Sequence, residues 1–210
     1  MKIGMTGKRK ILLTGFEPFD GSEVNPSILA CRKIEGREEG GFRIMVEEIP
    51  LRFNEIRGII EGHVEGYRPD AIICTGQAGG TCIELERVAI NVADARIPYN
   101  CGLQPLDERL NSEGPAAYFS SLPLRSIERA FKAARIPVVI SNSAGTFGCN
   151  QIFYHLMDHL AREGMEIPAG LIHVPCLPEQ VVGKGMPSMS LDLIVEALDC
   201  AVSTLVRTLT

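Results

Sequence analysis

The sequence predicts a three-layer α/β/α sandwich built around a mostly parallel, twisted sheet. Short apolar runs typical of strands alternate along the chain with helical patterns, and several runs are apolar at nearly every position. Such runs occur in strands covered on both faces by helices. The chain has 210 residues, of which 45% are hydrophobic. This length fits one domain, so we expect residues 1–210 to form a single unit with a substantial core.

Six apolar runs predict the strands of the sheet. They span residues 10–14, 42–49, 70–75, 85–92, 137–140 and 170–174. The run Phe42–Ile49 alternates apolar and polar residues, which is the period of a strand, whereas Asp70–Thr75 is almost entirely apolar. An unbroken apolar run of this length indicates a strand buried on both faces, as do the last two runs.

Helical patterns lie between these runs. They span residues 25–34, 53–67, 124–134, 151–162 and 190–209. Asn25 and Pro26 mark the first helix, because Asn is a favoured N-cap and Pro fits the first helical position. Pro69 ends the connection after the second helix. Residues 97–114 are rich in Pro, Gly, Asn and Asp and predict a long surface excursion.

Composition excludes several classes of function. The net charge is −5, and the one short basic run, Lys8–Lys10, only precedes the first strand, so we expect no nucleic-acid binding. No apolar run approaches the ~20 residues of a membrane span, so we expect no membrane insertion. The N-terminus lacks the long apolar core of a secretory signal, which predicts a cytoplasmic location. The seven cysteines form no C-x-x-C pair and indicate reduced thiols.

The segment Ser141–Asn150 carries the strongest chemical signal. It joins the apolar run Ile136–Ile140 to a helical pattern that begins near Asn150. Cys149 therefore falls where the first turn of a helix presents unpaired N–H groups, which favour a thiolate. The small residues before it leave the sulfur accessible. The alternative is a buried cysteine that packs at a helix start.

Four unusual segments each follow a predicted strand. They are Gly15–Gly21, Gly76–Gly80, Ser141–Cys149 and His173–Pro178. Ligand sites of such sheets form at the carboxyl ends of the strands. We therefore expect these four segments to converge on one site.

The histidines narrow the choice of a general base. A cysteine nucleophile usually needs an imidazole, and His173 ends a buried strand at the sheet edge where Cys149 is expected. His63 falls at a solvated position of a helical pattern. His155 and His159 are one helical turn apart, but no Glu follows His155 as the H-E-x-x-H zinc motif requires. We expect them to be surface or packing histidines, and we expect no metal site.

A third group should orient the imidazole. Glu86 is the preferred carboxylate because the run Glu86–Asn91 resembles a strand that would hold it in place, and Glu84 is the competitor. Either could instead be a solvated surface carboxylate. Arg96 could stabilise an oxyanion or pair with Asp94.

Five ordered blocks make the chain resemble one family, the pyroglutamyl peptidases of type I (pyrrolidone carboxyl peptidases). The resemblance runs from Leu12 to about Gln180. The blocks are Thr14–Phe19 with Asn25–Ser27, Gly76–Gly80, Glu86–Asn91 with Asp94–Arg96, Ser143–Asn150, and Ile172–Pro175 with Leu177–Gln180. Any one block alone would be weak, whereas five in order over most of the chain are specific.

The resemblance implies a cysteine peptidase that removes N-terminal pyroglutamate (5-oxoproline) from peptides, without a metal or cofactor. It implies Cys149 as the nucleophile, His173 as the general base and Glu86 as the orienting carboxylate. Arg96 matches an arginine near the oxyanion. The residues matched to substrate binding are Phe16, Phe19 and Phe147, which would sandwich the ring, and Gln77. The resemblance also implies homo-oligomers, tetramers or dimers, with residues 97–114 and the C-terminal helix as candidate contacts.

Two departures and two alternatives remain. Gly148 and Cys176 stand where the family pattern leads us to expect larger residues, which predicts a looser pocket wall at Gly148 and altered packing behind His173. One alternative is a catalytically silent homologue that binds pyroglutamyl peptides. The other is a nucleoside-phosphorylase-like enzyme that holds phosphate with Gly76–Gly80 and an arginine, Arg87 or Arg96. The latter would not need a cysteine and histidine pair.

Overall fold

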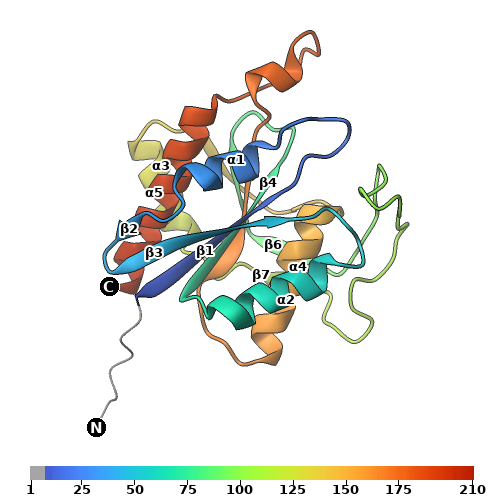
Figure 1. The fold of residues 1–210 in the computed structure, drawn as a ribbon, viewed down its shortest axis with the longest axis horizontal. Helices are drawn as coiled ribbons and strands as arrows, with labels where there is room; N and C mark the ends of the chain where they lie inside the picture. Colours follow the sequence, from blue (N-terminus) through green and yellow to red (C-terminus); the bar gives the residue numbers. More distant parts are fainter. Residues whose placement is uncertain (1–7) are drawn as a thin grey trace.

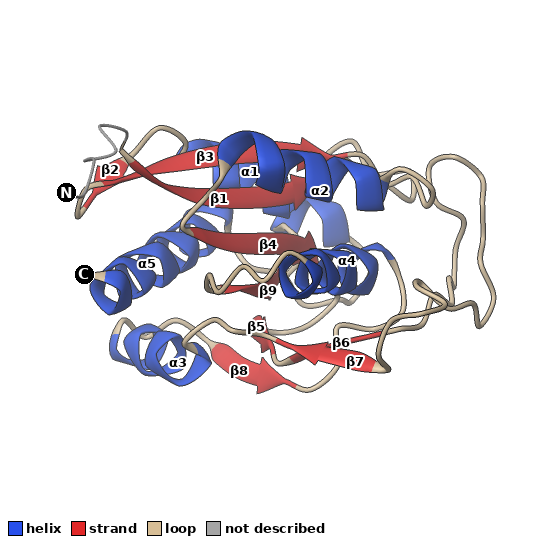
Figure 2. Ribbon diagram, turned by 90° about the horizontal axis from the view of Figure 1, so that it is seen from below, coloured by secondary structure: helices blue, strands red, loops and turns tan. Residues whose placement is uncertain are grey.

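The computed structural model describes residues 8–210, and it has the expected three layers (Figure 1). The expectation about an N-terminal signal falls largely on residues 1–7, which lie outside this range. A twisted sheet separates two helical layers (Figure 2). The predicted fold class, α/β with a mostly parallel sheet, is confirmed.

The main sheet has seven strands in the order β2-β3-β1-β4-β9-β5-β8. Their bounds are β1 Arg9–Phe16, β2 Glu38–Glu39, β3 Phe42–Ile49, β4 Ala71–Gln77, β5 Ile83–Glu86, β8 Val138–Ser141 and β9 Ala169–Val174. β1 pairs in parallel with β3 and β4, and β4 pairs in parallel with β9. These strands therefore end at one edge of the sheet, as the sequence predicts.

Five helices cover the two faces of the sheet. They are α1 Pro26–Lys33, α2 Ile56–Tyr67, α3 Leu124–Ala133, α4 Gly148–Arg162 and α5 Leu191–Leu209. α1, α3 and α5 pack in one layer, and α2 packs with α4 in the other. Along β1, Ile11 and Leu13 belong to the core under the first layer, and Leu12 to the core under the second. This explains the unbroken apolar runs, since alternate side chains are buried on opposite faces.

The α1 start agrees with its sequence signals. The side chain of Asn25 accepts a hydrogen bond from the N–H of Ser27 at 3.0 Å, and Pro26 occupies the first helical position. The Asn25 amide also donates to the carbonyl oxygen of Glu17 at 3.1 Å. The cap thus ties α1 to the loop after β1, which forms part of the site described below.

The single strand predicted at residues 85–92 is wrong. β5 ends at Glu86, and β6 (Val88–Ile90) pairs with β7 (Ala117–Phe119) in a separate two-stranded sheet. The chain changes sheets at Arg87, whose carbonyl oxygen accepts from the N–H of Ser120 at 2.9 Å. Glu86 consequently stands at the end of a strand. The short elements β2, β7 and a 3₁₀ turn, η1 (Pro178–Val181), were not predicted.

Not every strand follows the common direction. β5 is antiparallel to β9 and parallel to β8. Glu84 pairs directly with His173 across the β5–β9 ladder, and Leu85 pairs with Ile172. Since directly paired residues and those two positions away share a face of the sheet, both Glu84 and Glu86 lie on the face of His173.

Two further expectations, the surface excursion and the packing role of the paired histidines, agree with the structure. The excursion at residues 97–114 forms no helix or strand and is mostly exposed. His155 and His159 are each 3% exposed on α4, so they are packing residues. In the described part of the chain, neither belongs to a group of three potential metal ligands. No helix within residues 8–210 has the length and apolar character needed to cross a membrane.

Candidate active site

Cys149 is the second residue of α4, in the first helical turn. The N-cap residue, Phe147, is extended and has no side-chain oxygen that could accept from the first N–H groups of the helix. Asn150 fixes the start of the helix, because its side chain accepts from the N–H of Ile90 at 2.9 Å and donates to the carbonyl of Val92 at 3.0 Å. The helix start therefore presents both the sulfur and free N–H groups.

The sulfur and the imidazole meet over a glycine. The sulfur of Cys149 and the ring of His173 both lie beside Gly76. A Cβ atom at Gly76, near the end of β4, would overlap the sulfur of Cys149 and would stand 3.5 Å from Cδ2 of His173. Only a residue without a side chain lets the two groups come together at this point.

A buried carboxylate holds the other side of the imidazole. Nδ1 of His173 lies 2.8 Å from Oε1 of Glu86. Because a carboxylate only accepts, Nδ1–H is the donor, which leaves Nε2 for Cys149. Glu86 is fully buried, and its Oε2 has no hydrogen-bond partner among residues 8–210. Oε2 of Glu84 is 4.0 Å from Nδ1, so Glu86, the preferred candidate from sequence, makes the closer contact.

The site favours a charged imidazole. Burial alone lowers the pKa of His173, but the sulfur of Cys149 and the carboxylate of Glu86 outweigh it and raise the pKa to about 10. A protonated imidazole beside a thiolate is the state in which a cysteine is a strong nucleophile.

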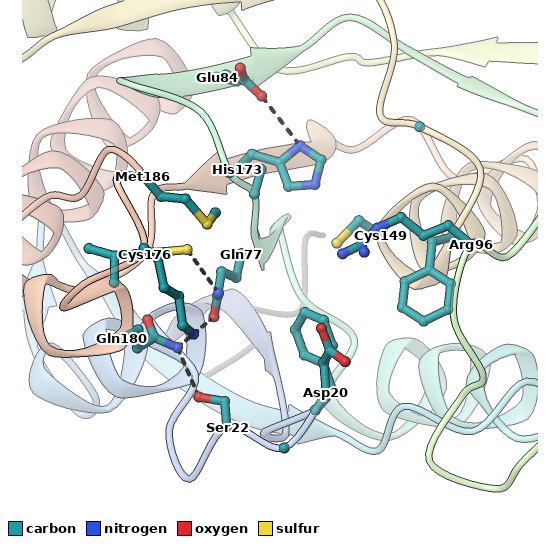
Figure 3. A pocket seen from close by; sticks show the side chains of 18 of the residues that line it. Asp20, Ser22, Gln77, Glu84, Arg96, Cys149, His173, Cys176, Gln180 and Met186 are labelled. Atoms are coloured by element: carbon teal, nitrogen blue, oxygen red, sulfur yellow. Dashed lines mark hydrogen bonds and ion pairs between the residues drawn. The ribbon is translucent and has the colours of Figure 1, made fainter.

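A pocket of about 710 Å³ opens above these groups (Figure 3). Residues from all four segments that the sequence singled out line it. They include Phe19–Ser22, Gln77–Gly79, Ser143–Phe147 with Cys149, and His173 with Cys176. The expected convergence is therefore observed.

The predicted aromatic residues divide into two groups. Phe19 and Phe147 line the pocket, with ring centroids 6.3 Å apart. Phe16 is 2% exposed and lies against Gly148, beneath the pocket lining. Tyr99, which the sequence analysis did not single out, packs on Phe147 with centroids 4.4 Å apart. The Phe147 ring is thus held in place by its contact with Tyr99.

A hydrogen-bond network joins three loops at the opposite wall. Nε2 of Gln180 donates to Oε1 of Gln77 at 3.2 Å and to Oγ of Ser22 at 3.0 Å. Its Oε1 accepts from the N–H of Leu177 at 2.8 Å. The Gln77 amide also donates to the sulfur of Cys176 at 3.1 Å. Cys176 therefore contacts a predicted binding residue, and it lines the same pocket as His173. Gln180 belongs to the segment Leu177–Gln180 that resembles the family, but only the structure shows that it joins these loops.

The wall at Gly148 is not loose. A Cβ atom at Gly148 would overlap Cδ1 of Leu51 and would stand 3.7 Å from the Phe16 ring. Leu51 is 3% exposed and fills the space that a larger residue would take. No sequence signal pointed to Leu51, since it lies almost 100 residues from Gly148.

Arg96 lines the pocket near Cys149 (Figure 3). Its segment is tied to the nucleophile loop, because the N–H of Asp94 donates to the carbonyl of Thr146 at 2.9 Å. The Thr146 hydroxyl donates to the carbonyl of Asp94 at 2.8 Å. Within residues 8–210, Arg96 forms no ion pair with Asp94, the alternative partner. Its guanidinium is therefore available to a ligand in the pocket.

Ligand atoms of Glu84, Glu86 and His173 lie within 4.8 Å of one another, a spacing that a metal ion would tolerate. The same atoms make the hydrogen bond between Glu86 and His173. A metal there would compete with the proton on Nδ1, so this cluster does not add a separate site. A cysteine near an imidazole that is hydrogen-bonded to a buried carboxylate is instead the arrangement of a cysteine hydrolase.

Comparison with known proteins identifies the family of hydrolases that the chain matches. Residues 9–208 match the family model described as pyroglutamyl peptidase. The pyrrolidone-carboxylate peptidase of Bacillus licheniformis is 47% identical over 194 residues, covering 92% of this chain and 90% of that protein. The one from Bacillus subtilis is 46% identical over 198 residues, covering 94% and 92%. The crystal structure of Bacillus amyloliquefaciens pyroglutamyl peptidase I has a TM-score of 0.92 at 44% identity, covering 95% of this chain and 98% of that one.

The chain therefore belongs to the pyroglutamyl peptidase family of cysteine peptidases. This confirms the family and the enzyme class that the five sequence blocks implied. The match to the family does not favour a nucleoside phosphorylase.

Replacing Gly76 by alanine tests the contact over which sulfur and imidazole meet. The new Cβ would displace the sulfur of Cys149, so we expect peptidase activity to fall at least about 100-fold, the loss typical of a 1 Å misplacement. The rate of Cys149 alkylation by iodoacetamide should fall as well. Gly79→Ala is the matched control, because its nearest neighbour would be Cε of Met186 at 3.7 Å, an ordinary contact. Equal activity in the two variants would contradict the contact.

Proposed function

We propose that this chain removes N-terminal pyroglutamate from peptides, with Cys149 as nucleophile, His173 as acid and base, and Glu86 as the orienting carboxylate. The observation that carries the proposal is the position of the Cys149 sulfur and the His173 ring on either side of Gly76, with the buried carboxylate of Glu86 hydrogen-bonded to the same ring. Family membership supports the reaction, and this geometry supports the assignment of roles.

Before the attack, the thiol of Cys149 transfers its proton to the imidazole of His173. The thiolate adds to the carbonyl carbon that follows the pyroglutamyl ring, which gives a tetrahedral oxyanion. The unpaired N–H groups at the start of α4, around Cys149, are placed to stabilise the oxyanion, and Arg96 adds a positive charge from the pocket wall.

Collapse of this intermediate breaks the peptide bond. Nε2–H of His173 protonates the departing amine, and the pyroglutamyl group stays on Cys149 as a thioester. A water molecule, deprotonated by His173, then hydrolyses the thioester and restores the thiolate. Through both steps Glu86 keeps Nδ1 protonated and the ring oriented. These steps use no metal or cofactor.

The pocket suits an uncharged, flat lactam. Phe19 and Phe147 offer aromatic faces, and the side chain of Gln77, at the end of β4, is held by Gln180. Phe16 would contribute from beneath Gly148. A lactam has one N–H and one C=O, so a few hydrogen bonds satisfy it. Proline has no ring carbonyl and carries a charged amine, so it would leave polar groups of the site unpaired.

Hydrolysis of pyroglutamyl-aminomethylcoumarin and prolyl-aminomethylcoumarin tests the function. We expect cleavage of the first substrate only, and loss of cleavage after thiol alkylation. Cys149→Ser should reduce turnover by at least about a thousandfold without changing the circular dichroism spectrum. No cleavage by folded, reduced protein would favour the catalytically silent homologue, and full activity of Cys149→Ser would contradict the assigned nucleophile.

Replacing Glu86 by glutamine tests the orienting role. We expect kcat/KM to fall by about 10- to 1000-fold, with some activity retained. Loss of the negative charge lowers the pKa of His173, so the imidazolium that protonates the leaving amine is lost at lower pH. The alkaline limb of the kcat/KM profile should therefore move toward neutral pH. A wild-type rate and profile would transfer the role to Glu84.

We also propose that the chain acts as one domain, assembles as a homo-oligomer (tetramer or dimer) and works in the cytoplasm. Leu103 and Leu106 on the long excursion are 43% and 79% exposed, and exposed apolar side chains favour contacts between subunits. All seven cysteines are free, as in a reducing compartment. Sedimentation velocity should give a multiple of the chain mass; a monomer at micromolar concentration would contradict the assembly. Cell fractionation checks the location.

A further inference from the structure

The direction of the leaving group follows from the general acid. His173 must protonate the departing nitrogen, so the residue after pyroglutamate lies on the His173 side of the sulfur. Figure 3 shows Glu84 and Met186 on that side of the pocket, and Arg96 beside Cys149. The aromatic residue Phe147 belongs to the Cys149 side, since it immediately precedes α4.

Glu84 brings an uncompensated negative charge to this side. It is the direct cross-strand partner of His173, and its side chain is 28% exposed and lines the pocket. Within residues 8–210 it forms no ion pair with a lysine or arginine. The imidazole 4.0 Å away already has a closer carboxylate in Glu86, at 2.8 Å. One imidazolium cannot neutralise both carboxylates.

Apolar side chains line the same pocket as this carboxylate. Met186 and Val182 are 44% and 79% exposed, and both line the same pocket on the segment after η1. Cε of Met186 lies 3.7 Å from the place where a Cβ of Gly79 would stand, so the thioether reaches over the loop after β4. An apolar wall that leads to a carboxylate is complementary to a side chain with an aliphatic stem and a cationic head.

We propose that Glu84 and Met186 form a subsite for the residue after pyroglutamate, and that this subsite selects arginine or lysine and disfavours aspartate and glutamate. The proposal rests on the proposed function, because it needs a pyroglutamyl group bound at Cys149. It names a preference among substrates that the reaction itself leaves open.

The other charges of the pocket do not reverse this preference. Glu179 and Lys184 are both exposed on the segment after β9, and they are opposite in sign. Asp20 is exposed, and Figure 3 shows it far across the pocket from Glu84. Arg96 lies beside Cys149, where the oxyanion forms. Glu84 is the least exposed of these groups, so solvent screens its charge the least.

Competition between isosteric peptides tests the subsite. Pyroglutamyl-arginine amide and pyroglutamyl-citrulline amide differ in charge but hardly in shape. With both in one mixture, we expect kcat/KM of the protein for the arginine peptide to be about 3- to 10-fold higher at low ionic strength. For pyroglutamyl-glutamate amide and pyroglutamyl-glutamine amide, we expect kcat/KM to be lower for the charged glutamate peptide. Both ratios should approach one at about 0.5 M salt, where charges are screened within a few ångströms.

Glu84→Gln should bring both ratios close to one while the citrulline peptide is still cleaved. Asp20→Asn is the matched control: it removes one carboxylate from the same pocket, and we expect it to leave the ratios as they are. A wild-type arginine-to-citrulline ratio near one, or a ratio that Glu84→Gln does not change, overturns the subsite while the peptidase activity stands. Failure to cleave any of the four peptides overturns the proposed function together with the subsite.

Discussion

The buried bond between Glu86 and His173 is the interaction on which the rest of the site depends. A fully buried carboxylate with a single partner would cost several kcal/mol if that partner were neutral or absent. Its charge is therefore stabilised by a protonated imidazole, and the same ring lies beside the sulfur of Cys149. The carboxylate thus sets the orientation of the imidazole that faces the cysteine.

The backbone around this cluster shows how closely it must be packed. Gly76 has no side chain where sulfur and imidazole meet, and Gly148 has none where Leu51 fills the wall below the nucleophile. At Gly148 the space is filled by Leu51, a residue almost 100 positions away in the chain. Gln180 performs a similar task at the other wall, where one amide holds the loops of Ser22, Gln77 and Leu177 together.

The pocket separates two demands that a peptidase of this kind must meet. On the side of Phe147 it offers aromatic surface and few charges, which suits a neutral ring. On the side of His173 it offers Glu84 and the exposed side chains after η1. In the proposed function and with the proposed subsite, recognition of the ring and selection of the next residue would use different segments of the chain.

Local chemistry in the sequence determined much of this protein. Apolar runs covered on both faces predicted the sandwich, Asn25 and Pro26 predicted the first helix, and a cysteine at a strand-to-helix junction predicted the nucleophile. These features depend on neighbours within a few residues, so they can be read without the fold. The choice between Glu84 and Glu86 could not, since a strand places residues two apart on the same face and the contact depends on how β5 packs against β9. The tertiary structure alone likewise decided three other features, because each depends on atoms from segments far apart in the chain. They are the end of β5 at Glu86, the packing of Leu51 against Gly148 and the hydrogen bonds of Gln180 to three loops.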